Sequence, residues 1–80
     1  MKWPRDLSGQ DLAKALKIFS YEVSHQTGSH IRLTTQEKGE HHITIPAHNP
    51  LKVGTLSTIL RDVANHLKIN KEELINQLFR

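Results

Sequence analysis

The stretch that decides the fold is residues 21–46, YEVSHQTGSHIRLTTQEKGEHHITIP. Three segments of it, Tyr21–Gln26, His30–Thr35 and His41–Pro46, alternate apolar and polar residues with the two-residue period of a half-buried strand. The apolar members predict a buried face made of Tyr21, Val23, Ile31, Leu33, Ile43 and Ile45. The polar members point to the opposite face, which is open to water: Glu22, Ser24, Gln26, His30, Arg32, Thr34, His42 and Thr44.

Two short polar segments join these strands as hairpin loops, Thr27-Gly28-Ser29 and Gln36–Glu40. A two-residue Thr27-Gly28 turn would pair an apolar with a polar residue along both faces. The alternation therefore favours a three-residue connection, which places Gln26 opposite His30. His25 shares the parity of Tyr21, so we expect it to pack at the edge of the buried face.

Helical patterns flank the strands on both sides. Ser8, with Asp11 three residues later, predicts a capped helix that runs to about Phe19. From Lys52 onward the period is helical again, with the apolar stripe Leu56, Ile59, Leu60, Val63, Ala64 and Leu67. A short last helix begins at Asn70, whose cap is answered by Glu73. The order α-β-β-β-α plus a short C-terminal helix predicts an α+β fold, with an antiparallel three-stranded sheet and helices packed on one face.

Length and composition narrow the class of protein. Residues 1–80 leave room for a single domain with a small core, and the absence of cysteine excludes disulfides and thiolate metal sites. No apolar stretch is long enough to cross a membrane, and Met1–Arg5 is followed by charge instead of a signal sequence, so we expect a cytoplasmic protein. The net charge of +3 favours a polyanionic partner without requiring one.

The six histidines do not form a metal site by this reading. His41 and His42 are adjacent on a strand and must point to opposite faces. Pairing Thr35 with His41 places His42 about 13 Å along the strands from His30, which is too far for two ligands of one ion. We expect neither a metal nor an organic cofactor.

His30 on the open face is a candidate general acid or base. An exposed imidazole has a pKa near ~6.5 and exchanges protons at neutral pH. RNA cleavage suits such a group, because the ribose 2′-OH is an internal nucleophile that must lose a proton while the leaving oxygen gains one. The alternative is that His30 is only a polar residue on a solvated sheet.

A second candidate feature is the start of the long helix, where Lys52 precedes Val53-Gly54-Thr55. Free backbone N–H groups, the positive end of the helix dipole and a lysine together form an anion site. The alternative is ordinary helix initiation. Arg32 shares the face of His30 and can stabilise a developing charge or simply serve solubility. His48 and Asn49 can line the same patch, whereas Arg61 and His66 are expected on the outer face of the helix without a catalytic role.

Three sequence motifs, in order along nearly the whole chain, resemble the HicA or YcfA-like toxins. Gln26-Thr27-Gly28-Ser29-His30 is similar to the Gly-Ser-His signature of that family at the start of the second strand. Pro4-Arg5 with Ser8-Gly9 and Leu12–Leu16 resembles its opening helix. The strand-to-helix segment is matched by Ile45-Pro46, His48, Leu51-Lys52, Gly54-Thr55-Leu56 and Ile59-Leu60.

The resemblance implies a fold like that of the double-stranded-RNA-binding domain (dsRBD-like), a ribosome-independent mRNA interferase activity, and a HicB-type antitoxin that covers the active face. It maps the catalytic histidine to His30. The residues expected to bind RNA are Gly28, Ser29, Arg32, Lys52, Gly54 and Thr55. A noncatalytic RNA-binding module remains the alternative, since domains of this shape are not all enzymes.

The chain also departs from the family pattern. Val53 stands where many members carry proline, and Ile31-Arg32-Leu33 follows the signature where many have an aromatic residue. We expect the first change to loosen the helix start and the second to alter substrate contacts. The last residues, Asn70–Arg80, leave open whether the chain forms a homodimer or uses this stretch to contact the antitoxin.

Overall fold

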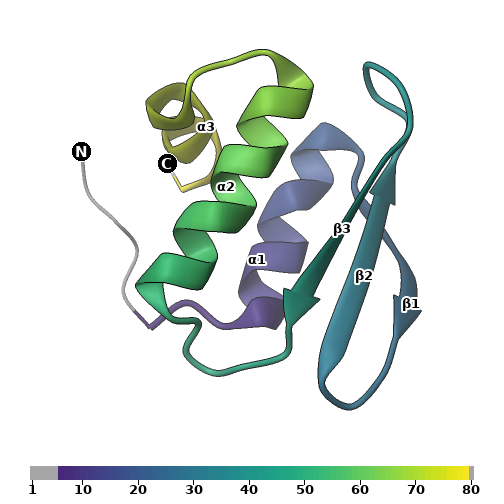
Figure 1. Cartoon of the computed structure of the whole chain (residues 1–80), viewed down its shortest axis with the longest axis vertical. Coiled ribbons are helices and arrows are strands. Elements are labelled where there is room, and N and C mark those ends of the chain that lie inside the picture. Colours follow the sequence, from purple (N-terminus) through teal and green to yellow (C-terminus); the bar gives the residue numbers. More distant parts are fainter. Residues whose placement is uncertain (1–5, 80) are drawn as a thin grey trace.

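The sheet forms one layer, two helices form a second layer on one face of it, and a third helix packs behind them. The computed structural model describes residues 6–79; Met1–Arg5, which include the Pro4-Arg5 part of the resemblance, and Arg80 lie outside the described residues. The strands β1 (Glu22–Gln26), β2 (His30–Thr35) and β3 (His41–Pro46) make an antiparallel sheet in the order β1-β2-β3. The helices α1 (Gly9–Ala15) and α2 (Val53–Leu67) lie on one side of it, and α3 (Lys71–Leu78) packs against α2 away from the sheet (Figure 1). The predicted α+β, dsRBD-like fold is confirmed.

The pairing of β2 with β3 is regular over its whole length. Thr35 pairs with His41, and the register continues without a break to His30 opposite Pro46. The burial alternates as predicted, with Ile31, Leu33, Ile43 and Ile45 buried toward the helices. The intervening Arg32 and Thr44 are exposed on the other face. That second face therefore stays open to solvent and to ligands.

The first strand differs from the prediction. A bulge at Ser24 shifts the register, so Val23 pairs with Leu33 but Gln26 pairs with Ile31, and the expectation of Gln26 opposite His30 was wrong. One extra residue in a strand reverses the face to which all residues beyond it point. The bulge therefore has the effect that we had expected of a three-residue loop, and Val23 still lies opposite Leu33.

Burial on β1 was also predicted wrongly. Val23 is 46% exposed, and His25 is exposed instead of packing at the edge of the core. The reason is the position of the helices: α1 packs over β2 and β3 and α2 packs beside β3, while every residue of β1 remains exposed. Alternation alone does not show which strand the helices fail to cover.

The first helix begins as predicted and ends differently. Ser8 Oγ accepts a hydrogen bond from Asp11 N at 3.0 Å, and Asp11 Oδ2 accepts one from Ser8 N at 3.3 Å, which completes the capping box. The α-helix ends at Ala15 and continues as a tighter 3₁₀ helix, η1 (Leu16–Phe19), so a continuous α-helix to Phe19 was wrong. Ser20 then adopts a left-handed conformation that turns the chain and delivers Tyr21 into the core.

The remaining helices agree with their sequence patterns. All six residues of the predicted α2 stripe are buried. Asn70 Oδ1 accepts a hydrogen bond from Glu73 N at 2.7 Å, which caps α3, and Leu74 and Ile75 pack into the core that is continuous with α1, α2 and the sheet. Within residues 6–79, no helix combines the length and apolar character that a membrane crossing needs.

Candidate functional site

The turn between β1 and β2 fixes the backbone of His30. Thr27 N donates to His30 O at 2.9 Å, which closes a turn around Gly28 and Ser29. The Thr27 hydroxyl oxygen in turn accepts hydrogen bonds from His30 N at 3.1 Å and Ser29 N at 3.3 Å. Ala47 N donates to Ser29 O at 2.9 Å and ties the turn to the end of β3. These hydrogen bonds therefore fix the position of the His30 backbone.

The imidazole of His30 is presented to solvent. The residue is exposed, as predicted, and its Nδ1 lies 3.0 Å from Ser29 Oγ. Within residues 6–79, no group forms a hydrogen bond with Nε2 of this ring. One ring nitrogen is thus oriented by a neighbour while the other is available to a ligand.

Cross-strand pairing gives His30 and Arg32 fixed neighbours on the open face. His30 lies opposite Pro46 and Arg32 lies opposite Thr44. Opposed residues of an antiparallel pair have Cα atoms about 4.5–5.5 Å apart, and residues two positions apart on one strand are about 7 Å apart. These four side chains therefore form one continuous patch at the start of β2 and the end of β3.

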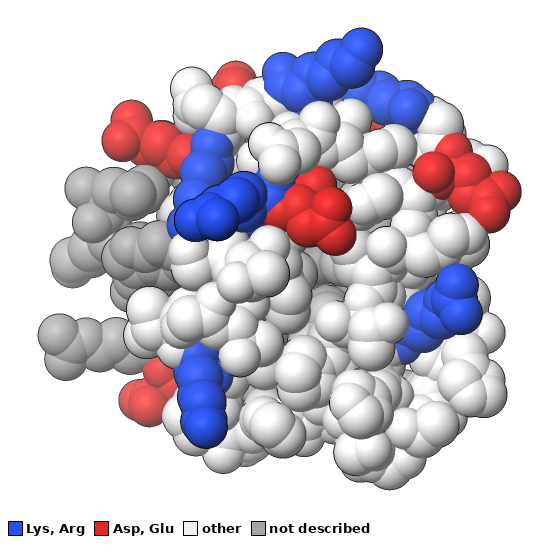
Figure 2. Space-filling view, viewed as in Figure 1, with Lys and Arg blue, Asp and Glu red and all other residues white. Residues whose placement is uncertain are grey.

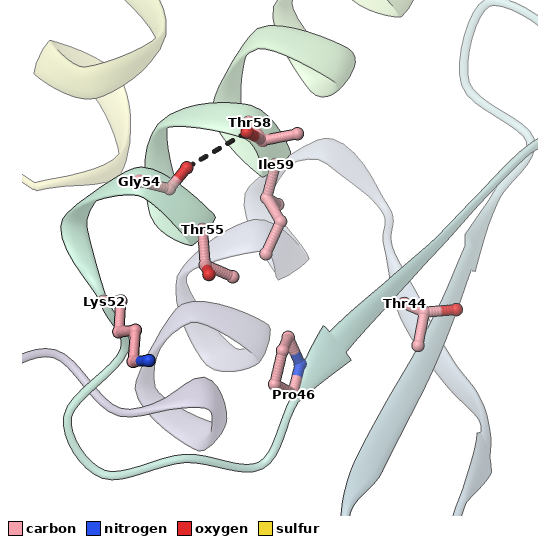
Figure 3. A pocket seen from close by; sticks show the side chains of 7 residues that line it. All are labelled: Thr44, Pro46, Lys52, Gly54, Thr55, Thr58 and Ile59. Carbon is pink, nitrogen blue, oxygen red and sulfur yellow. Dashed lines mark hydrogen bonds between the residues drawn. The ribbon is translucent and has the colours of Figure 1, made fainter.

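A pocket of about 590 Å³ adjoins this patch between β3 and the start of α2 (Figure 3). Its lining residues are Thr44, Pro46, Lys52, Gly54, Thr55, Thr58 and Ile59. Pro46 and Thr44 belong both to the pocket wall and to the cross-strand pairs, so these two residues of β3 stand between the pocket and their partners His30 and Arg32 on β2.

The start of α2, which lines the pocket with Lys52, Gly54 and Thr55, carries backbone donors that no helical bond uses. Lys52 is the N-cap residue and makes no side-chain capping bond, and the first helical hydrogen bond runs from Leu56 N to Lys52 O at 2.9 Å. The N–H groups of Val53, Gly54 and Thr55 therefore precede the helical ladder, as the first donors of any α-helix do. Thr58 Oγ1 is used within the helix, where it donates to Gly54 O at 3.0 Å.

The predicted site residues fall on the two sides of the Pro46–Thr44 wall. Ser29, His30 and Arg32 lie on the β2 side, and Lys52, Gly54 and Thr55 lie on the α2 side. Gly28 is exposed in the turn, and a Cβ added there would meet no atom within 4 Å, so packing does not require glycine at this position. His48 and Asn49 are exposed and do not contribute to the lining of the pocket.

Four lining residues were missed by the sequence reasoning: Thr44, Pro46, Thr58 and Ile59. A signal for Pro46 was present, because the predicted pairing of Thr35 with His41 already places Pro46 opposite His30. The part played by Thr58 and Ile59 depends on how closely α2 approaches β3, which the helical period does not reveal.

A second polar cluster lies at the other end of β3. Tyr21 Oη donates to His41 Nδ1 at 2.7 Å, and His41 Nε2 lies 3.2 Å from Asp62 Oδ1. The ring of His41 also stacks on that of His66. His66 Nε2 donates to two carbonyl oxygens of the β2–β3 loop, Glu37 O at 2.9 Å and Gly39 O at 3.1 Å. The expectation that His66 lies on the outer face of the helix was wrong, because α2 turns it toward this loop.

Two pKa shifts arise from neighbouring groups at the opposite end of β3 from Pro46 and His30. Burial, together with the negative charges of Asp62 and Glu37, raises the pKa of Tyr21 to about 12. A hydrogen bond from His42 lowers the pKa of Glu40.

Figure 2 shows cationic and anionic side chains interspersed over the viewed face, without one continuous basic surface. Among residues 6–79, no three His, Asp or Glu side chains are placed to hold one metal ion.

Comparison with known proteins identifies the family. Residues 9–64 match the model of the HicA toxin of bacterial toxin-antitoxin systems. No curated protein and no solved structure gave a significant match. The matched stretch covers more than half of the chain and includes the turn at His30, the open patch and the pocket up to Ile59. The chain therefore belongs to the HicA family of bacterial toxin-antitoxin toxins.

Proposed function

We propose that this protein is an endoribonuclease, an mRNA interferase in which His30 is the catalytic proton carrier. The observation that carries the proposal is the exposed imidazole with an available Nε2, beside a pocket that holds a lysine and the start of a helix. Growth arrest by degradation of mRNA is the expected cellular outcome of a toxin with this activity.

The chemistry requires one proton carrier and one anion-binding group. His30 Nε2 takes the proton from the ribose 2′-OH while the 2′-oxygen forms a bond to the adjacent phosphorus. The bond from phosphorus to the 5′-oxygen then breaks, and that oxygen receives a proton from the imidazolium. The products are a 2′,3′-cyclic phosphate and a free 5′-OH. A positioned group of this kind contributes ~10²–10⁴-fold to the rate.

The residues around the pocket are suited to the phosphate. Lys52 supplies a positive charge, and the first N–H groups of α2, at Gly54 and Thr55, supply donors at the positive end of the helix dipole. Arg32, on the other side of the wall, stabilises the negative charge that develops at phosphorus. The open turn at Gly28 and Ser29 lets the RNA backbone approach His30 closely.

No cofactor is required by this chemistry. The 2′-OH is the nucleophile, so no metal-activated water is needed, and cleavage should persist when the protein is assayed in excess EDTA. Loss of cleavage in EDTA with recovery on adding a divalent cation would contradict this part of the proposal.

The second partner is a protein. Membership of the family implies an antitoxin, and we propose that a HicB-type antitoxin silences the toxin by covering the open sheet face that carries His30 and Arg32. Residues on that face are exposed in the free chain, which makes them accessible to such a partner.

The test is the His30→Ala variant, expressed in cells and assayed for growth arrest, mRNA degradation and RNA binding. We expect growth arrest and degradation to vanish while RNA binding survives. If the variant still arrests growth and degrades mRNA like the parent, the catalytic assignment is wrong. If the purified parent binds RNA but leaves it intact, the protein is a noncatalytic RNA-binding module or a toxin that has lost its activity.

A further inference from the structure

We propose that Ser29 is a positioning residue that selects the tautomer of His30. The inference rests on the proposed function, in which Nε2 of His30 takes a proton from RNA. It concerns the other ring nitrogen: Nδ1 lies 3.0 Å from Ser29 Oγ, and within residues 6–79 neither atom has another hydrogen-bond partner.

The backbone of Ser29 is held by the same turn that holds His30. Ser29 N donates to Thr27 Oγ1 at 3.3 Å, and Ser29 O accepts from Ala47 N at 2.9 Å. Both ends of the serine backbone are therefore fixed, one to Thr27, which follows β1, and the other to Ala47, which follows β3. As a result, the Cα and Cβ atoms of Ser29 keep a fixed position relative to His30, from which Oγ reaches Nδ1.

The direction of this hydrogen bond decides what Nε2 can do. A neutral imidazole carries one N–H, so a proton on Nδ1 leaves a lone pair on Nε2. When Ser29 Oγ accepts from Nδ1–H, Nε2 is a base that can take the 2′-OH proton. After proton uptake both nitrogens carry a proton, and Oγ keeps the same accepting role. The contact therefore persists through base and acid steps without reversal.

The choice of a hydroxyl also matters. A histidine free in water favours the tautomer with the proton on Nε2, which is the wrong one for a base at that nitrogen. A hydroxyl can donate as well as accept, so the inference is specifically that Ser29 Oγ accepts from Nδ1–H and opposes this preference. Because the hydroxyl is neutral, it brings no negative charge near the phosphate that His30 must approach. A carboxylate in the same place would orient the ring equally well but would repel the RNA backbone.

The first experiment needs no RNA. Nitrogen-15 NMR of the ring of His30, above the pH at which it is protonated, reports which nitrogen carries the proton. We expect Nδ1–H to predominate in the parent and in Ser29→Thr, which keeps the hydroxyl, and Nε2–H to predominate in Ser29→Ala. A parent with Nε2–H predominant, or a Ser29→Ala variant with an unchanged tautomer, would overturn the inference.

The second experiment measures cleavage of an RNA oligonucleotide across pH. Ser29→Ala should lower kcat about tenfold on the base-limited side of the profile, with KM unchanged, because one neutral hydrogen bond is lost. Ser29→Thr should recover most of the rate, and Ser20→Ala, an exposed serine remote from the turn, should match the parent. Equal loss in Ser29→Ala and Ser29→Thr overturns the positioning role. In contrast, undiminished cleavage by His30→Ala overturns the proposed function itself.

Discussion

The imidazole rings of His41 and His66 stack with centroids 4.3 Å apart and planes 9° from parallel. His41 is the first residue of β3, and His66 lies in the last turn of α2. Since the carboxylate of Asp62 only accepts, Nε2 of His41 is the donor of that contact, which leaves Nδ1 of the neutral ring to accept from Tyr21 Oη. This cluster fastens the β2–β3 loop to α2, at the opposite end of β3 from Pro46 and the candidate site.

Replacement of His66 by alanine should destabilise the fold without removing the chemistry. The variant loses the stacked ring and leaves the carbonyl oxygens of Glu37 and Gly39 without their donor. We expect the free energy of unfolding to fall by about 1–3 kcal/mol, measured by urea denaturation. The RNA cleavage rate of the folded fraction should match that of the parent.

The matched control is His25→Ala, an exposed histidine on β1. It should change the free energy of unfolding by no more than about 0.5 kcal/mol. Equal effects of the two variants would show that the cluster does not stabilise the loop.

Tyr21 should lose its phenolic proton at a higher pH than a tyrosine in an unfolded chain. It is the only tyrosine, so phenolate absorbance reports on it directly. Burial beside Asp62 and Glu37 raises its pKa to about 12 in the folded protein, against about 10 in an unfolded chain. The unfolded state therefore loses the proton first. The free energy of unfolding should be independent of this group below about pH 10 and should decrease between about pH 10 and 12. A phenolate transition near pH 10 in the still folded protein would contradict the observed environment.

Gly9 should not tolerate a side chain. A Cβ built on this buried glycine would lie 2.2 Å from Pro46 O and 3.3 Å from Ala47 Cα, which are backbone atoms that no rotamer change can move. Gly9→Ala should therefore cost about 1–3 kcal/mol of stability and displace the strand end opposite His30, which lowers cleavage as well. Thermal unfolding and RNA cleavage check both effects.

Gly54→Ala is the control for stability. The space around Gly54 is open, and alanine is the better helix former, so this variant should be as stable as the parent or up to about 1 kcal/mol more stable. A loss at Gly54 equal to that at Gly9 would show that the clash with Pro46 is not the cause.

Lys52 should contribute an electrostatic, sequence-independent part of RNA affinity. Lys52→Gln should weaken binding to unrelated RNA oligonucleotides alike and reduce the slope of log affinity against log salt by about one counterion. Lys17→Gln, which removes an exposed charge from η1, is the control for net charge. If both variants have the same salt slope, the affinity comes from overall charge and not from the pocket.

The elements that sequence predicted best are those with one strongly apolar face. In β2 and β3, isoleucine and leucine alternate with polar residues, so Ile31, Leu33, Ile43 and Ile45 are buried together, and a one-residue slip of either strand would turn its apolar residues to solvent. The α2 stripe is equally unambiguous. Burial of apolar side chains is the dominant favourable term in folding, so these patterns predict both the type of element and the face that is buried.

Strand β1 and the 3₁₀ turn were less predictable because local sequence does not decide them. The bulge at Ser24 depends on how a short hairpin turn and an edge strand are reconciled, and its polar contacts, such as Thr34 Oγ1 to Ser24 Oγ at 3.0 Å, form only in the assembled sheet. The exposure of Val23 depends on where the helices stop covering the sheet.

Part of the candidate site was predicted from the sequence. Parity placed His30 and Arg32 on the open face, and helix-start chemistry singled out Lys52, Gly54 and Thr55. Their common border at Pro46 follows from the register, but the pocket follows from the distance between α2 and β3. Tertiary packing of this kind, like the approach of His66 to His41, leaves no periodic signal in the sequence.

The most direct test of the central claim is single-turnover cleavage of one RNA oligonucleotide by purified parent and His30→Ala proteins. The matched substrate carries 2′-deoxyribose at the cleaved position. We predict that His30→Ala binds the RNA as the parent does but cleaves it at least about 100-fold more slowly. The parent should leave a 2′,3′-cyclic phosphate and should not cleave the deoxy substrate. Cleavage by His30→Ala at the parental rate would contradict the claim.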